Sequence, residues 1–107
     1  MTMRPPVFHI LLALSEGDRH GLGIAEEVER ASGGSVSLGP GTLYRSLAEM
    51  VQEGLIRSVK APPQAADPRR KYYRMTAAGR VALKDEAIRL AKLVGAARAR
   101  NVIEGPA

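Results

Sequence analysis

The spacing of the apolar residues changes once along this chain, and that change limits the possible folds more than any other feature. Three stretches before residue 54 carry apolar side chains mostly three or four residues apart, which is the spacing of one helix face. Two short runs rich in Ile, Val and Tyr follow at 55–60 and 71–75, and the helical spacing returns from residue 77. Three helices, two strands and a further helix predict a mainly α fold with a small β-hairpin.

The first two helices have candidate inward faces and candidate ends. The first helix follows Pro5 and Pro6 and is closed by Gly17, and the second runs from about residue 21 to 31. Their predicted inward residues are Val7, Ile10, Leu11 and Leu14 in the first helix and Leu22, Ala25 and Val28 in the second.

The third helix is predicted over about 40–53, because Pro40 suits a first helical turn and Gly54 suits the position after the last one. The remaining faces near its N-terminus carry small, hydroxyl, aromatic and cationic groups, which is typical either of a solvated face or of a contact surface. The predicted inward stripe is Leu43, Leu47, Met50 and Val51, and the outward group is Pro40, Gly41, Thr42, Tyr44 and Arg45.

The hairpin predicted over 57–75 is strongly basic. The whole chain has 16 Lys and Arg against 11 Asp and Glu, a net charge of +5, and small basic proteins favour polyanions. From Arg57 to Arg80 there are seven basic residues and one acid, Asp67. Three prolines make 61–70 a mobile loop rather than a ladder. Phosphate contact is the natural use for such a hairpin, and a solvated turn is the alternative.

The last helix is predicted to begin after the cap Thr76 and to run to about Ile103. Its apolar residues recur at spacings of 4, 3, 4 and 3, the repeat of a seam that packs on a second helix. The seam predicts a homodimer, and the alternative is a helix that folds back on its own core. The predicted interface residues are Leu83, Ala87, Leu90, Val94 and Ala97.

Several function classes lack their sequence signals. The absence of Cys removes disulfides, thiolate nucleophiles and Cys-ligated metals. His9 and His20 have no metal-site spacing, and His20 is instead expected near the start of the second helix, where it can approach a phosphate. No nucleophile elbow, phosphate loop or carboxylate pair occurs, so we expect no enzyme, catalytic residue, metal or cofactor. The apolar run 7–14 is too short for a membrane span, and we expect a cytoplasmic protein.

Three segments give the chain a specific resemblance. HGLGIAEEV, GTLYRSLAEMVQEGLI and KYYRMTAAGR resemble the PadR family of bacterial transcriptional regulators, over residues 7–80. The resemblance implies a winged helix-turn-helix DNA-binding domain at 1–76, a dimerisation helix at 77–107 and the function of a repressor. It also implies a small-molecule effector, whose identity the sequence does not indicate.

In a winged helix the third helix enters the major groove and the hairpin, or wing, follows the phosphates. The outward group of the third helix is then expected to contact DNA, with packing between helix and hairpin as the alternative for Tyr44. A homodimer would present two such helices to a pseudo-palindromic, double-stranded operator. The alternative function is a protein-protein interaction module without DNA binding, which the basic hairpin disfavours. The wing residues expected on phosphates are Lys60, Arg69, Arg70 and Lys71.

Overall fold

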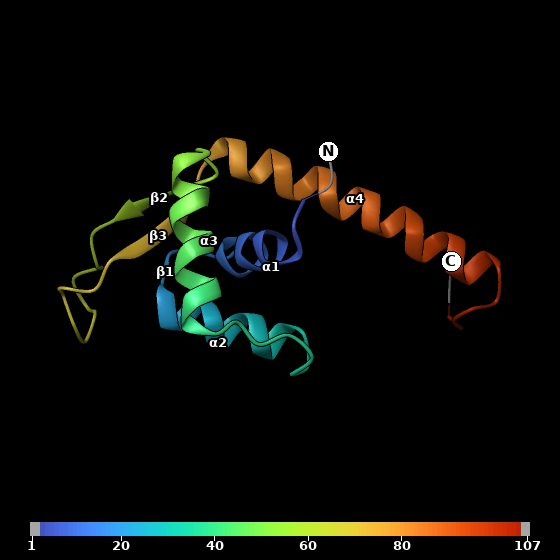
Figure 1. The fold of residues 1–107 in the computed structure, drawn as a ribbon, viewed down its shortest axis with the longest axis horizontal. Helices are drawn as coiled ribbons and strands as arrows, with labels where there is room; N and C mark the ends of the chain where they lie inside the picture. The colour runs from blue at the N-terminus through green and yellow to red at the C-terminus, as the bar shows by residue number, and fades with distance from the viewer. Residues whose placement is uncertain (1–2, 106–107) are drawn as a thin grey trace.

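The computed structural model of this protein describes residues 3–105, and its elements follow the predicted order with one addition (Figure 1). The fold is mainly α with a small antiparallel sheet, as predicted. The elements are α1 (Pro5–Leu14), β1 (Arg19–His20), α2 (Gly21–Ala31), α3 (Pro40–Gln52), β2 (Ile56–Val59), β3 (Tyr72–Met75) and α4 (Ala77–Ala99).

The core gathers around α1, which contacts α2, α3, α4 and β3. All four predicted inward residues of α1 are buried, and so are Leu43, Leu47 and Met50 of α3. Burial of these side chains on one face of each helix is the main stabilising contribution to such a fold. The buried apolar residues are Val7, Ile10, Leu11, Ala13, Leu14, Ile24, Val28, Leu43, Leu47, Met50, Ile56 and Tyr73.

Two inward residues were predicted wrongly. Leu22 is exposed, and Ile24 is fully buried in its place, because α2 turns Gly21, Ile24 and Val28 toward α1 and α3. Val51 is also largely exposed at the end of α3. Only a limited arc of a helix can face the core. Leu43, Leu47 and Met50 occupy this arc on α3, and Val51 lies at its edge.

The sheet has three strands in the order β1-β3-β2, so the predicted hairpin gains a short third strand. β2 pairs antiparallel with β3, with Ser58 opposite Tyr73, and β1 pairs along the other edge of β3, with His20 opposite Tyr72. A two-residue strand is too short to show any periodicity in the sequence. The added strand attaches the start of α2 to the base of the wing.

The caps of α3 and α4 match their sequence signals. Pro40 occupies the first turn of α3. Gly54 lies just after the end of the same helix with φ +77°, a conformation that favours glycine. Thr76 caps α4 by accepting a hydrogen bond from Gly79 N at 3.1 Å. The helix ends at Ala99 rather than near Ile103, and Asn101 follows with φ +59°.

α4 extends well beyond the other elements (Figure 1). The described chain measures 50 × 26 × 25 Å, and its radius of gyration is 15.4 Å. A compact domain of this length has a radius of gyration of about 13 Å. The first turns of α4 pack on α1, and there Glu86 is buried and accepts two hydrogen bonds from Arg89. The later turns have no such support.

Gly79 allows α4 to lie directly against the turn that follows α3. A Cβ added at Gly79 would overlap the carbonyl oxygen of Leu55, which also accepts a hydrogen bond from Thr76 N. We expect Gly79→Ala to lower the free energy of unfolding by about 1–3 kcal/mol, because backbone atoms must move. Gly95→Ala is the control on the same helix, since an added Cβ there meets nothing within 4 Å.

The control should raise the free energy of unfolding by about 0.5–1 kcal/mol, because alanine is the better helix former. Urea denaturation of both variants measures the two changes. Equal stabilisation by both substitutions would show that α4 does not approach Leu55 closely.

Candidate nucleic-acid interface

The N-terminal half of α3 presents the predicted outward group to solvent. Leu43 and Leu47 fix the inner side of the helix in the core, and Arg45 lies on the opposite side and is exposed. Pro40 and Gly41 are also exposed, and Thr42 is half-buried. Arg45 forms no ion pair within residues 3–105, so its guanidinium is available to an external acceptor.

The tip of the wing is folded by two turns. Ala65 N donates to Pro62 O at 3.0 Å, and Arg70 N donates to Asp67 O at 3.2 Å. The carboxylate of Asp67 also accepts a hydrogen bond from Arg69 N at 3.0 Å, which is an Asx turn. These turns place the run from Arg69 to Lys71 where the tip returns to β3.

The basic residues of the wing divide into paired and unpaired cations. Arg74 binds Asp18 with two hydrogen bonds of 2.9 and 2.7 Å, and this contact lowers the pKa of Asp18. Arg69 lies 3.3 Å from the carboxylate of Asp67. In the described part of the chain, no carboxylate pairs with Arg57, Lys60, Arg70, Lys71 or Arg80.

His20 links α2 to the wing, a role that the sequence did not reveal. Its Nδ1 accepts a hydrogen bond from Gly23 N at 3.1 Å and caps α2, so the ring proton of the neutral imidazole is assigned to Nε2. Tyr72 meets the ring edge to face at 5.3 Å. Arg70 Nη1 lies 3.3 Å from Nδ1 and 3.0 Å from Nε2. These near-equal distances put the guanidinium against the face of the ring.

Tyr44 leans from α3 onto the first turn of α2. Its side chain is 53% exposed, yet a Cβ added at Gly21 would lie 2.7 Å from the phenolic oxygen of Tyr44. Only glycine therefore leaves room for the ring in this position. The packing expected as the alternative for Tyr44 thus occurs in part, and its contact is with α2.

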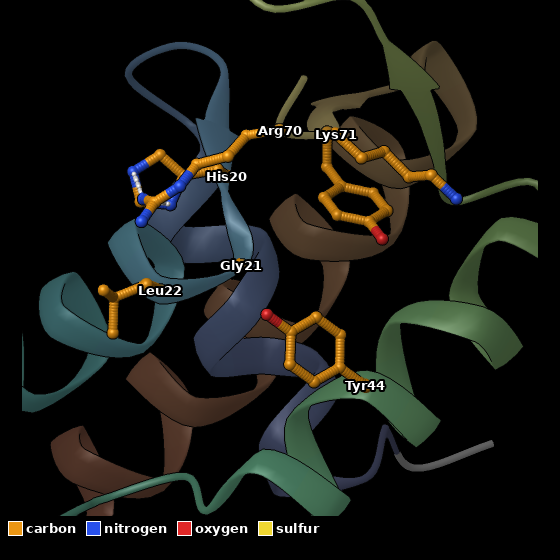
Figure 2. A pocket seen from close by; sticks show the side chains of 7 residues that line it. His20, Gly21, Leu22, Tyr44, Arg70 and Lys71 are labelled. Atoms are coloured by element: carbon orange, nitrogen blue, oxygen red, sulfur yellow. Dashed lines mark hydrogen bonds between the residues drawn. The ribbon is translucent and has the colours of Figure 1, made fainter. Parts of the chain in front are cut away.

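A cavity of about 600 Å³ lies between α2, α3 and the wing (Figure 2). In Figure 2 the Tyr44 hydroxyl points toward Gly21, and Arg70 reaches over the ring of His20. The cavity therefore gathers two cations, a histidine and two phenols from segments far apart in the sequence. Its lining residues are His20, Gly21, Leu22, Tyr44, Arg70, Lys71 and Tyr73.

The predicted seam of α4 divides into a covered and an uncovered part. Leu83 packs against the core of its own chain, and Leu90 is half-buried. Val94 lies about three turns after Leu83 on the same face, but it is 41% exposed, and Leu93 beside it is 57% exposed. Ala87 is exposed and Ala97 is half-buried. One face of α4 is thus covered by its own domain at one end only.

Residues 3–105 contain neither a metal-binding cluster nor a membrane-spanning helix. No group of three His, Asp or Glu side chains in this range is placed to hold a metal ion. No helix in the same range combines the length and the apolar character that crossing a membrane requires.

Comparison with protein families gives one match that covers most of the chain. The model of the transcriptional regulator PadR-like family matches residues 10–85. A transcriptional regulator of Mycobacterium tuberculosis is 37% identical over 98 residues, which are 91% of this chain and 81% of that protein. An uncharacterized protein of a Streptomyces fradiae transposon is 37% identical over 86 residues, 80% of this chain, but the chain spans only 23% of its length.

Solved structures with the same fold include two of this family. A PadR family transcription regulator from Clostridium difficile superposes with a TM-score of 0.75 at 26% identity, over 92% of this chain and 98% of that one. Bacillus subtilis PadR, solved in complex with operator DNA, superposes with a TM-score of 0.68 at 25% identity. That match covers 79% of this chain and 48% of the PadR chain. These likenesses agree with the winged-helix arrangement of α1 to β3.

Proposed function

The chain belongs to the PadR-like family of transcriptional regulators, and from this premise we propose that it is a homodimeric repressor of a pseudo-palindromic DNA operator. α3 enters the major groove in this proposal, and the wing lies along the neighbouring phosphates. Residues 1–76, with the first turns of α4, form the DNA-binding unit. The later turns of α4 form the dimer contact. The protein acts in the cytoplasm, where an operator lies.

The exposed Arg45 at the start of α3 is the observation that carries the proposal. Leu43 and Leu47 hold one side of the helix in the core, and this directs Arg45 away from it. An unpaired guanidinium at the N-terminal end of such a helix suits the acceptor pair O6 and N7 of guanine. Bacillus subtilis PadR, which shares the fold, is known in complex with operator DNA.

The unpaired cations of the wing support the same proposal. Lys60, Arg70 and Lys71 are exposed and have no carboxylate partner among the residues that the structure describes. A hairpin that carries several unpaired cations attracts a polyanion such as DNA. An interaction module for another protein would not need this excess of positive charge.

The uncovered end of α4 supports the dimer. Leu93 and Val94 continue the face that Leu83 buries in its own domain, and nothing in residues 3–105 covers them. A second copy of α4 supplies a matching apolar face, as in a two-helix seam. Two recognition helices then read half-sites separated by one helical turn of DNA or a multiple of it.

Selection from a random duplex library, followed by mobility shifts at two salt concentrations, tests the function. We expect enrichment of one pseudo-palindromic sequence and weaker binding at higher salt. Absence of DNA binding, together with capture of a protein partner by the same face, would favour the interaction-module alternative.

Removing one wing cation should flatten the salt dependence. We expect Arg70→Ala and Lys71→Ala each to reduce the slope of log affinity against log salt by about 0.9, for specific and non-specific DNA alike. Glu29→Gln on the far end of α2 is the control, and it should leave the slope unchanged. A wild-type slope in both wing variants would remove these residues from the phosphate contact.

A further inference from the structure

The cavity between α2, α3 and the wing contains two phenolic hydroxyls without partners. Tyr44 and Tyr73 both line it, and no hydrogen bond joins either hydroxyl to another side chain or backbone group in residues 3–105. Burial, and to a smaller degree the nearby Tyr44, raises the pKa of Tyr73, so its hydroxyl remains protonated at neutral pH. Both groups are therefore free to donate to an external acceptor.

The same cavity is bordered by two of the wing cations that have no carboxylate partner. Arg70 and Lys71 line it, whereas their neighbours Arg69 and Arg74 are paired with Asp67 and Asp18. Carboxylates are absent from the lining. A cavity that offers cations and hydroxyl donors, with no negative side chain, suits an anionic oxygen group.

His20 contributes to the same arrangement. Because its Nδ1 accepts from Gly23 N, the proton on Nε2 is a donor, and Arg70 Nη1, also a donor, lies 3.0 Å away. Two donors this close do not satisfy each other. An acceptor oxygen at the edge of the ring, beside both nitrogens, would satisfy both.

We propose that this cavity holds one backbone phosphate of each DNA half-site, and that Tyr44 is a phosphate-positioning residue rather than a reader of bases. The inference rests on the proposed function, and it assigns the cavity to the DNA backbone because α3 and the wing, the two DNA-contacting elements, form its walls. The phosphate accepts hydrogen bonds from Tyr44 and from the two wing cations. It thereby fixes the position of α3 along the groove.

Gly21 makes the arrangement possible, and this gives a variant that replaces no DNA-contacting residue. Gly21→Ala forces the Tyr44 ring to move, because the added Cβ would lie 2.7 Å from its oxygen. Gly23→Ala is the matched control two residues away, where a Cβ makes an ordinary contact of 3.5 Å with His20. Tyr44→Phe removes only the hydroxyl and keeps the ring.

The test measures the affinity of full-length variants for the library-selected duplex, intact or with a neutral methylphosphonate at one position at a time. We expect Tyr44→Phe and Gly21→Ala to weaken binding about tenfold with unchanged base preference, and Gly23→Ala to bind as the wild type does. One methylphosphonate in each half-site should weaken wild-type binding and abolish the difference between Tyr44→Phe and the wild type. At every other position the difference should persist.

Two results of the affinity measurements would overturn the inference while the wild type still binds DNA. One is a changed base preference in Tyr44→Phe, which would make Tyr44 a base reader. The other is a loss in Tyr44→Phe that no single methylphosphonate removes. Inorganic phosphate should compete with the duplex no better than chloride of equal ionic strength, and specific competition would assign the cavity to a free anion instead. A wild-type protein that binds no DNA would overturn the proposed function itself.

Discussion

Val94→Glu should convert the proposed dimer into single chains and weaken binding to the selected operator by roughly 10²–10⁴-fold, because this is the gain in affinity that linking two binding modules provides. Val94 is 41% exposed on the face of α4 that Leu83 buries at the other end of the helix. A carboxylate there would be desolvated in the two-helix seam without a cation to pair with it. Light scattering and operator affinity measure the two effects.

Val81→Glu is the matched control, because Val81 is also a valine on α4 but is 61% exposed. At 100° per residue, Val81 points about 140° away from Val94 around the helix axis. This variant should remain dimeric and bind the operator normally. If Val94→Glu also stays dimeric, the later turns of α4 do not form the interface. A monomeric Val94→Glu with full operator affinity would separate dimer formation from DNA binding.

Arg45→Ala should weaken operator binding by roughly 1–3 kcal/mol and relax the preference at one base position in each half-site. Arg45 is exposed opposite the buried side of α3, and no carboxylate pairs with it in the described residues. A bidentate contact with guanine has this magnitude and affects only that base pair. Binding to a randomised operator library measures both quantities.

Arg57→Ala is the control for the loss of one positive charge. Arg57 is exposed on β2, outside α3, and likewise has no carboxylate partner among the residues that the structure describes. As an unpaired cation of the wing it should weaken binding to all sequences alike and leave the base preference unchanged. A uniform loss of affinity in Arg45→Ala, with unchanged preference, would make Arg45 a phosphate contact and leave Thr42 as the candidate reader.

The proposed phosphate position and the base contact have different signatures in these experiments. Tyr44→Phe is expected to weaken all sequences alike, whereas Arg45→Ala is expected to weaken some more than others. The two residues are neighbours in the sequence but differ in direction. Tyr44 leans on Gly21, whereas Arg45 is exposed on the side of α3 opposite Leu43 and Leu47. Adjacent residues on a helix point about 100° apart, which permits this division of roles.

The sequence alone determined the order of the elements and most of their ends. Thr76, Pro40 and Gly54 act within one turn of their own positions, so their signals are local and readable. The inward face of α1 and, except for Val51, that of α3 followed from helical spacing for the same reason. The basic character of the wing is likewise a property of composition.

Only the tertiary structure decided how the candidate site is assembled. His20 and Arg70 meet across 50 positions of sequence, and Asp18 and Arg74 across 56. Three further features depend on partners that no local spacing encodes. They are the strand β1, the exposed position of Leu22 and the placement of Tyr44 on Gly21. The later turns of α4 are uncovered because they extend past the part of the helix that packs on α1. Local signals reach a few residues, whereas these features arise from packing between elements, which is settled only when the whole chain folds.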